Sequence, residues 1–159
     1  MSAQLDLIPR YRRMTAVDLD AVVAIEEAIY PHPWTRGNFS DALAAGYECW
    51  VVECGGEQAG YCVVMIAAEE AHLLNLSVGS PWQRRGIGRE VLGFALQLAR
   101  RRGAARVLLE VRPSNEAARA LYASAGFAEV ATRRGYYPAH AGREDAIVLE
   151  LALEGKRES

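Results

Sequence analysis

Two glycines one residue apart, Gly86 and Gly88, follow a pair of arginines in the stretch QRRGIGREVLGFALQLARRRG, and a long amphipathic run begins after them. Glycine lets the backbone turn sharply and come close to a ligand. The start of a helix offers unpaired N–H groups and the positive end of the helix dipole, and phosphate is its usual ligand. The spacing therefore predicts an anion-binding loop. The alternative is an ordinary turn before a helix, with solvent-exposed arginines.

The loop differs from two widespread phosphate-binding motifs. A Walker loop ends in Gly-Lys-Ser or Gly-Lys-Thr, and the sequence has neither. A dinucleotide fingerprint needs a third glycine at the position that Val91 occupies. That fingerprint also opens a βαβ unit, whereas three strand-like runs precede this loop. We therefore expect the loop to hold a phosphate of another kind of ligand.

A carboxylate in an apolar strand is the second feature. In RVLLEVR, Val107, Leu109 and Val111 form one alternation, which is typical of a core face. Glu110 lies on the other face, and burying its charge is costly. Two interpretations stay open. Glu110 is either paired with an arginine such as Arg112, or it is a general base whose pKa is raised by partial burial.

Asn115 and Tyr122 are seven residues apart in PSNEAARALYASAG, a run typical of a helix. Seven residues are two helical turns, so both side chains are expected on one face, about 10 Å apart along the axis. A cofactor arm lying along that face would touch both. The alternative for Tyr122 is a half-buried helix aromatic.

Periodicity and turn residues predict the elements that position these groups. Helical stripes are broken by Pro31 and Pro33 and by Gly46, Gly103 and Gly126. The expected helices start at Thr15 and Thr35 and then cover 88–102 and 113–126; the expected strands are 47–54, 58–67, 71–78, 105–111, 128–137 and 145–153. This order predicts an α/β protein with a mixed sheet and helices on both faces.

Composition sets broad limits. A chain of 159 residues suits one domain, expected over 1–153, with either a loose lead-in or an edge strand in about the first ten residues and a disordered tail at 154–159. The net charge of −2 argues against a nucleic-acid binder held by bulk positive charge. The three cysteines read as buried, reduced thiols, and the three histidines are scattered, so we expect no metal site. No long apolar run occurs, which favours a soluble, cytoplasmic protein without a membrane partner.

The loop QRRGIG is similar to the Q/R-x-x-G-x-G/A loop of the GCN-related N-acetyltransferases (GNAT), which binds the pyrophosphate of acetyl-coenzyme A. The segments HPW, LNLSV, LLEVRPSNEAARALYASAGF and RRGYYPAHAGREDAIVLEL agree as well, so the resemblance covers roughly residues 12–153. It implies the GNAT fold, a central mixed, mostly antiparallel sheet of six to seven strands flanked by about four helices. The motifs resemble the branch that acetylates the N-terminal alanine of a small-subunit ribosomal protein.

The resemblance also implies a role for each site residue. The cofactor-binding residues would be Leu76 and Val78 through their main chain, the loop Arg84, Arg85, Gly86, Ile87, Gly88 and Arg89 around the pyrophosphate, and Asn115 on the pantetheine arm. Glu110 would accept the amine proton through water, and Tyr122 would protonate the departing thiolate. Tyr136, Tyr137 and Trp34 would line the acceptor site. No cysteine needs to act as nucleophile, so the resemblance implies direct transfer.

The acceptor remains open between classes. A protein N-terminus is the first expectation, because an α-amine with a pKa of about 7.7–8.0 needs less help from a base than lysine at about 10.4. Other protein N-termini or a small-molecule amine are the alternatives, and a non-catalytic acetyl-coenzyme A-binding module is a third. Glu110 and Tyr122 disfavour the third. A monomer without direct nucleic-acid contact is expected.

Overall fold

The computed structural model describes residues 8–153, so the predicted tail at 154–159 and most of the predicted lead-in lie outside the described residues. The elements follow the predicted order, with an edge strand at residues 10–13. They are β1 (Arg10–Arg13), η1 (Ala16–Asp18), α2 (Leu19–Ile29), α3 (Arg36–Ala44), β2 (Glu48–Cys54), β3 (Glu57–Ala67), β4 (Glu70–Val78), η2 (Ser80–Trp82), α4 (Ile87–Arg101), β5 (Arg106–Val111), α5 (Glu116–Ser124), β6 (Ala128–Ala139) and β7 (Gly142–Ala152), where η marks a short 3-10 helix.

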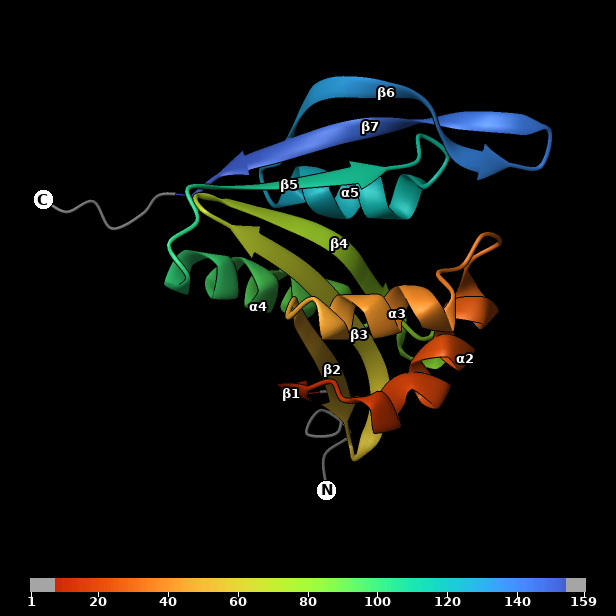
Figure 1. Cartoon of the computed structure of the whole chain (residues 1–159), viewed down its shortest axis with the longest axis vertical. Helices are drawn as coiled ribbons and strands as arrows, with labels where there is room; N and C mark the ends of the chain where they lie inside the picture. The colour runs from red at the N-terminus through yellow and green to blue at the C-terminus, as the bar shows by residue number, and fades with distance from the viewer. Residues whose placement is uncertain (1–7, 154–159) are drawn as a thin grey trace, which may run out of the picture. The chain divides into compact units, whose positions relative to one another are not determined.

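The strands form one seven-stranded sheet in the order β1-β2-β3-β4-β5-β7-β6 (Figure 1). The pairs β1–β2, β2–β3, β5–β7 and β6–β7 are antiparallel, and β4–β5 is parallel. A parallel neighbour needs a crossover connection, which here contains α4. The predicted mixed, mostly antiparallel sheet with about four helices is therefore confirmed.

The chain groups into two compact units. Unit 1 contains Met1–Met65 and Leu74–Ala95, and unit 2 contains Ile66–Leu73 and Leu96–Ser159. Strand β4 contributes to both units, since His72 and Glu70 belong to unit 2 and Asn75 to Val78 belong to unit 1. The single domain expected over residues 1–153 stays a prediction.

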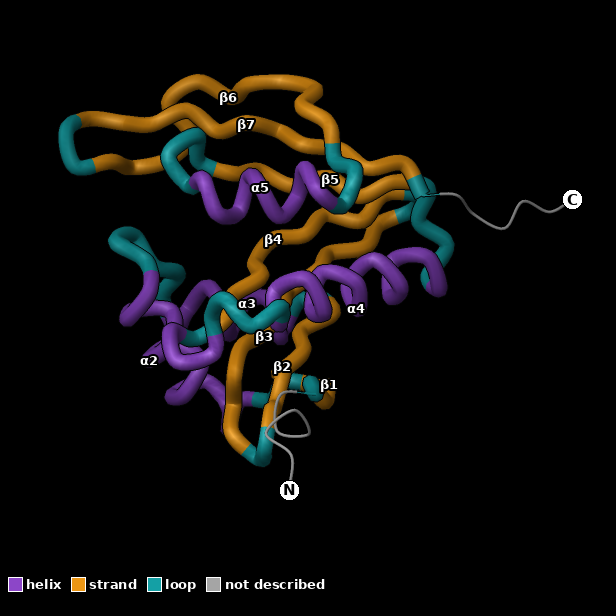
Figure 2. Tube along the Cα trace, turned by 180° about the vertical axis from the view of Figure 1, so that it is seen from behind, coloured by secondary structure: helices purple, strands orange, loops and turns teal. Residues whose placement is uncertain are grey.

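Unit 1 has a core on each face of its strands, because side chains alternate along β2 and β3. Figure 2 shows the course of these strands and of the helices of the unit. Val51 and Tyr61 face a cluster that contains Val22 of α2 and Phe39 of α3. Val52 and Cys62, their neighbours in sequence, face a second cluster, to which α4 contributes Ile87 and Val91. The buried members of this second cluster are Val52, Cys54, Ala59, Cys62, Val78, Ile87 and Val91. Helices therefore cover both faces, as predicted.

Both predicted helix caps in unit 1 are present. The Thr15 amide donates to Asp18 Oδ2 at 2.8 Å, which completes a capping box at η1, directly before α2. The Thr35 hydroxyl accepts from the Asn38 amide at 3.1 Å at the start of α3. Such caps satisfy amides that have no intrahelical acceptor. The caps fix where each helix begins. The cap at Thr35 therefore also sets where the segment between α2 and α3 ends.

Unit 2 pairs β5 with the long β6–β7 hairpin, and α5 belongs to the same unit (Figure 1). Val107, Leu109 and Val111 are buried, as their alternation predicted. Strand β6 bulges between Arg133 and Tyr137, because four steps along β6 oppose only two steps along β7. A bulge bends a strand and changes the direction of its side chains. This bulge lies next to the predicted acceptor tyrosines.

The cysteines are buried, reduced thiols, as predicted. Burial raises the pKa of Cys49 to about 11 and that of Cys62 to about 12. Thiols with such pKa values remain protonated near neutral pH and are poor nucleophiles. Among the described residues, none of the helices combines the length and the apolar character that crossing a membrane requires.

Replacing Gly60 with alanine is expected to lower the free energy of unfolding by about 1–3 kcal/mol. An added Cβ at this position would lie 2.2 Å from the carbonyl oxygen of Ser77, which is main chain and cannot rotate away. Urea unfolding measures the effect. Gly93→Ala is the matched control, because a Cβ on that helical glycine meets nothing within 4 Å. The control should gain about 0.5–1 kcal/mol; equal stability of the two variants would contradict the steric argument.

Candidate active site

The predicted anion loop is an irregular turn that leads directly into α4. Arg84 has a φ of 64° and Gly86 a φ of 82°, both in the left-handed region. The first backbone bond of the helix runs from the Glu90 amide to the Gly86 carbonyl at 3.2 Å. The amides of residues 87–89 therefore have no acceptor within the helix. Side chains of Arg84, Arg85 and Arg89 are exposed, so this end of α4 carries a high density of positive charge.

These features fit a diphosphate. Free amides, the positive end of a 15-residue helix and three arginine side chains all favour an anion. The space beside Gly86 is open, since an added Cβ there meets nothing within 4 Å. Sequence reasoning gave Gln83 no role, yet its amide Nε2 donates to the Val78 carbonyl at 2.8 Å and joins the loop to the end of β4. The spacing of glycines and arginines in a motif does not reveal such a side-chain contact.

Hydrogen bonds from a side chain and from the main chain of unit 1 hold the end of β4 and the residue after it. The Leu76 carbonyl accepts from the Tyr30 hydroxyl at 3.4 Å, and the Gly79 amide donates to the Ala59 carbonyl at 2.7 Å. The side chain of Val78 is 8% exposed and belongs to the core, as expected. The main-chain roles of Leu76 and Val78 toward a pantetheine arm stay predictions.

Trp34, expected in the acceptor site, lies in the segment between α2 and α3. Its ring packs against Phe39 with centroids 5.0 Å apart, and its amide donates to Glu26 Oε2 at 2.9 Å. Glu26 is 2% exposed, and its Oε1 accepts from the Tyr61 hydroxyl at 2.7 Å and from the Asn75 amide at 3.2 Å. Sequence reasoning missed Glu26. The signal was its position four residues after Val22, on the apolar stripe of the helix.

The hydrogen bonds continue from Glu26 along β4. Ser77 Oγ donates to Asn75 Oδ1 at 2.7 Å and lies 2.7 Å from the Tyr30 hydroxyl. Burial raises the pKa of Tyr30. The pKa of Tyr61 is raised more, by burial and by the neighbouring charge of Glu26. The network of Glu26, Tyr30, Tyr61, Asn75 and Ser77 therefore ties α2, β3 and β4 together beside Trp34.

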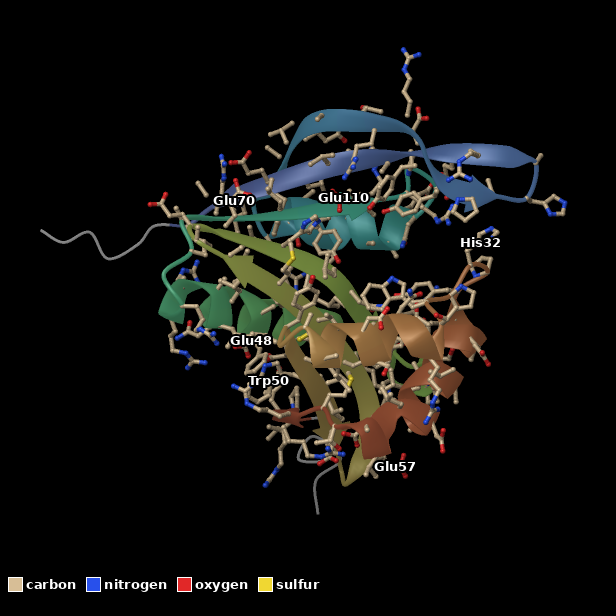
Figure 3. All side chains as sticks on the ribbon, viewed as in Figure 1. His32, Glu48, Trp50, Glu57, Glu70 and Glu110 are labelled. Carbon is tan, nitrogen blue, oxygen red and sulfur yellow. The ribbon has the colours of Figure 1, made fainter. Side chains whose placement is uncertain are left out.

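Glu110 lies in a charged cluster of unit 2, on β5 (Figure 3). Its Oε1 is 2.6 Å from Nε2 of His72 on β4, and its Oε2 accepts from Arg133 Nη1 of β6 at 3.2 Å. The side chain is 11% exposed. Both oxygens therefore have partners from other strands, one on the adjacent β4 and one on β6, which lies beyond β7 in the sheet.

Glu110 is paired with an arginine, as one of the two interpretations held, but the partner is Arg133, and the expected rise of its pKa is wrong. The hydrogen bond from His72 is the largest influence and lowers its pKa; burial opposes this and Arg133 adds to it, so the pKa lies below the ordinary value rather than above it. Arg112 is not its partner, because Arg112 lies past the end of β5 and pairs with Glu144 at 3.1 Å. Sequence reasoning missed His72, since alternation along one strand does not reveal which residue of the next strand lies beside it.

The two acceptor tyrosines adjoin this cluster. The guanidinium carbon of Arg112 lies 4.4 Å from the centroid of the Tyr137 ring. The pKa of Tyr137 is raised, mainly by burial and secondly by the negative charge of Glu110. Tyr136 is 41% exposed, with the guanidinium of Arg133 4.5 Å from its ring centroid. The structure thus brings Glu110, Tyr136 and Tyr137 together in unit 2.

Asn115 and Tyr122 differ from the predicted pair on one helical face. Asn115 is the N-cap of α5 with non-helical dihedrals, and its Oδ1 accepts from the Ala118 amide at 3.2 Å. The helix begins at Glu116, so the expected helical position of Asn115 is wrong. Tyr122 lies on α5 and is 8% exposed, with its ring edge-to-face against Phe127 at 5.6 Å. Their roles toward a cofactor stay predictions.

The sheet and the loop at the start of α4 agree with the acyltransferase fold that the sequence motifs resemble. The chain belongs to the acetyltransferase (GNAT) family, whose model matches residues 19–127. Both the family and the fold expected from the sequence are therefore confirmed.

Curated relatives resemble the chain over nearly its whole length. The [ribosomal protein bS18]-alanine N-acetyltransferase of Escherichia coli strain K12 is 37% identical over 140 residues, which are 88% of this chain and 95% of that protein. The putative [ribosomal protein bS18]-alanine N-acetyltransferase of Bacillus subtilis strain 168 is 31% identical over 144 residues, 89% of this chain and 94% of that protein.

Solved structures agree. The crystal structure of the ribosomal-protein-S18-alanine N-acetyltransferase from Escherichia coli has a TM-score of 0.85 at 34% identity and covers 96% of this chain and 99% of that chain. Arabidopsis thaliana Naa50, solved in complex with the bisubstrate analogue CoA-Ac-MVNAL, has a TM-score of 0.79 at 20% identity, covers 91% of this chain and 99% of that chain, and supports the fold.

Proposed function

We propose that this acetyltransferase transfers the acetyl group of acetyl-coenzyme A to the α-amino group of an N-terminal alanine on ribosomal protein bS18. The observation that carries the proposal is the 37% identity to the Escherichia coli enzyme of that name, with 95% of its length covered. An alignment of this extent includes segments for the acceptor as well as the cofactor loop. A resemblance confined to cofactor binding would support the family without supporting an acceptor.

The proposed donor site uses main-chain groups. Arg84, Arg85, Gly86, Ile87, Gly88 and Arg89 bind the pyrophosphate, Leu76 and Val78 bind the pantetheine arm through their main chain, and Asn115 adds a side-chain contact. This proposal is supported by the left-handed φ angles of Arg84 and Gly86 and by the unpaired start of α4. The Val78 amide is assigned to polarise the thioester carbonyl, because a fixed N–H aimed at the developing oxyanion stabilises it.

The acceptor must lose a proton when its nitrogen bonds to the acetyl carbon. The α-amine has a pKa of about 7.7–8.0, so a fair fraction is neutral near pH 7. The charged cluster around Glu110 provides a place for that proton, because its carboxylate is 11% exposed and hydrogen-bonded to an ionisable ring. Tyr122 then assists the departing thiolate. Tyr136, Tyr137 and Trp34 are assigned to the acceptor peptide, and for the two tyrosines their place beside Glu110 supports this.

A peptide panel tests the proposal. Peptides that begin with Ala, Ser, Met or Lys, each with a free N-terminus, are incubated with the enzyme and acetyl-coenzyme A, and acetylation is located by fragment mass spectrometry. The bS18 peptide beginning with Ala should be modified at its α-amine with the highest kcat/KM. The matched control is the same peptide with a blocked N-terminus and internal lysines. Modification of the control, or of free lysine amines alone, would contradict the proposal.

A further inference from the structure

His72 lies against Glu110, and neither the predicted site nor the proposed function gives it a role. The parallel pairing of β4 and β5 sets His72 beside Leu108, and Glu110 lies two residues farther on the same face of β5. The ring can therefore reach the carboxylate, and its Nε2 lies 2.6 Å from Glu110 Oε1. The imidazole is 24% exposed, more than the 11% of the carboxylate behind it.

Glu110 by itself is a weak acceptor for an amine proton. Its Oε1 is engaged by His72, and its Oε2 accepts from Arg133 at 3.2 Å. These partners hold its pKa below the ordinary 4.5. The attacking amine is neutral and gives up its proton only as the nitrogen bonds to the acetyl carbon, so a carboxylate of lowered pKa is a weak base for that step. A base closer in pKa to the amine would carry the proton better.

Imidazole is the side-chain group that meets that requirement, and His72 is the histidine in contact with Glu110. An ordinary histidine titrates near pH 6.5, much closer to the amine than a carboxylate. When one ring nitrogen donates to a carboxylate, the other carries the lone pair. With Nε2 committed to Glu110, that nitrogen is Nδ1. In residues 8–153 the structure records no partner for Nδ1.

We propose that His72 is the group that takes the amine proton and that Glu110 orients its ring and stabilises the imidazolium, an inference that rests on the proposed acetyl transfer. The amine nitrogen bonds to the acetyl carbon, the carbon–sulfur bond breaks, and the amine proton moves to Nδ1 of His72. The sulfur takes the phenol proton of Tyr122. The proton on His72 then returns through water to the Tyr122 phenolate, which restores both side chains.

The other charged groups of the cluster do not replace Glu110 as the partner of His72. Arg133 of β6 faces the far oxygen of Glu110, and Tyr137 of β6 lies close enough to Glu110 to have its pKa raised by that charge. Arg106 and Glu70, at the starts of β5 and β4, pair with each other. The cluster thus retains one carboxylate, Glu110, in direct contact with the imidazole.

The proposal has a kinetic signature in the pH dependence. His72 must be neutral to accept a proton, so the rate falls once the imidazole is protonated at low pH. The acceptor amine must be neutral as well, so its protonation lowers the rate a second time at low pH. Where both groups are protonated, log kcat/KM should rise with a slope of two per pH unit. Without the imidazole the slope should be one.

The closing experiment compares His72→Gln with His140→Gln on the alanine peptide. Glutamine can still donate an N–H to Glu110 but does not accept a proton near neutral pH, so positioning is kept and basicity is removed. His140 is exposed in the turn between β6 and β7 and serves as the matched control. We expect His72→Gln to lose at least tenfold in kcat, with a slope of one, a KM for acetyl-coenzyme A within threefold and unchanged thermal unfolding. The control should match the wild type.

A His72→Gln variant that keeps kcat within threefold and a slope of two would overturn the proposal. The same holds if His72→Ala is slow while His72→Gln is fast, because the ring would then act only by positioning Glu110. Failure of the proposed acceptor looks different: the wild type would leave the alanine peptide unmodified but acetylate another amine, and the same His72 comparison is then made with that amine. A wild type that acetylates no amine at all removes both proposals.

Discussion

Replacing Tyr122 with phenylalanine is expected to lower kcat by about 10²-fold or more while the KM for acetyl-coenzyme A stays within a few-fold of the wild type. The departing thiolate has a pKa near about 8.5 and tyrosine near about 10, so complete proton transfer is uphill by roughly 2 kcal/mol. A strong hydrogen bond from the phenol in the transition state still lowers the barrier. Phenylalanine keeps the ring and its packing against Phe127, so stability should change little. Steady-state kinetics and thermal unfolding measure both effects.

Tyr47→Phe is the matched control for this substitution. Tyr47 is partly buried against the core of unit 1, and the change removes a hydroxyl there as well. Its kcat should equal that of the wild type. A combined Glu110→Gln and Tyr122→Phe variant should still bind acetyl-coenzyme A within a few-fold in a direct titration. If Tyr122→Phe transfers the acetyl group at the wild-type rate, the phenol has no part in thiolate departure.

Sequence periodicity predicted most of the fold because it reports local physics. The start of α4 was predicted from Gly86 and the apolar run that follows it, and its positive φ of 82° confirms the need for glycine. The capping residues Thr15 and Thr35 likewise marked helix starts, since a cap depends on residues within one turn. Asn115 was placed inside a helix expected from residue 113, whereas the helix begins at Glu116, because helix boundaries are the weakest part of a periodic signal.

The candidate site was predicted less completely because its contacts join strands that are distant in the sequence. Glu110 was correctly singled out as a carboxylate on an apolar strand, but its neighbours His72 and Arg133 depend on the order of strands in the sheet. The bulge in β6 was also missed. Its signal was Gly135 within a strand-like run, with a φ of 58° and its amide bonded to Asp145 at 2.9 Å.

Glu26→Leu is expected to lower the free energy of unfolding by about 3 kcal/mol or more. The substitution leaves three donors without their acceptor: the Tyr61 hydroxyl, the Asn75 amide and the Trp34 main-chain amide. A buried donor left unpaired costs about 1–3 kcal/mol, and Glu26 is 2% exposed, so water cannot readily replace it. For a chain of this length the melting temperature should fall by about 6–12 °C, which differential scanning calorimetry measures.

Glu27→Leu is the matched control, because Glu27 is the next residue on α2 and is exposed. Its melting temperature should stay within about 2 °C of the wild type. A double-mutant cycle with Tyr61→Phe then measures the coupling free energy between Glu26 and Tyr61, separately from the effect of losing either side chain alone. Phenylalanine removes the donor that Glu26→Leu leaves unpaired, so the double variant should be less destabilised than the sum of the two single variants. Strict additivity would mean that the carboxylate and the phenol do not stabilise each other, and the network around Trp34 would then have to be held by packing.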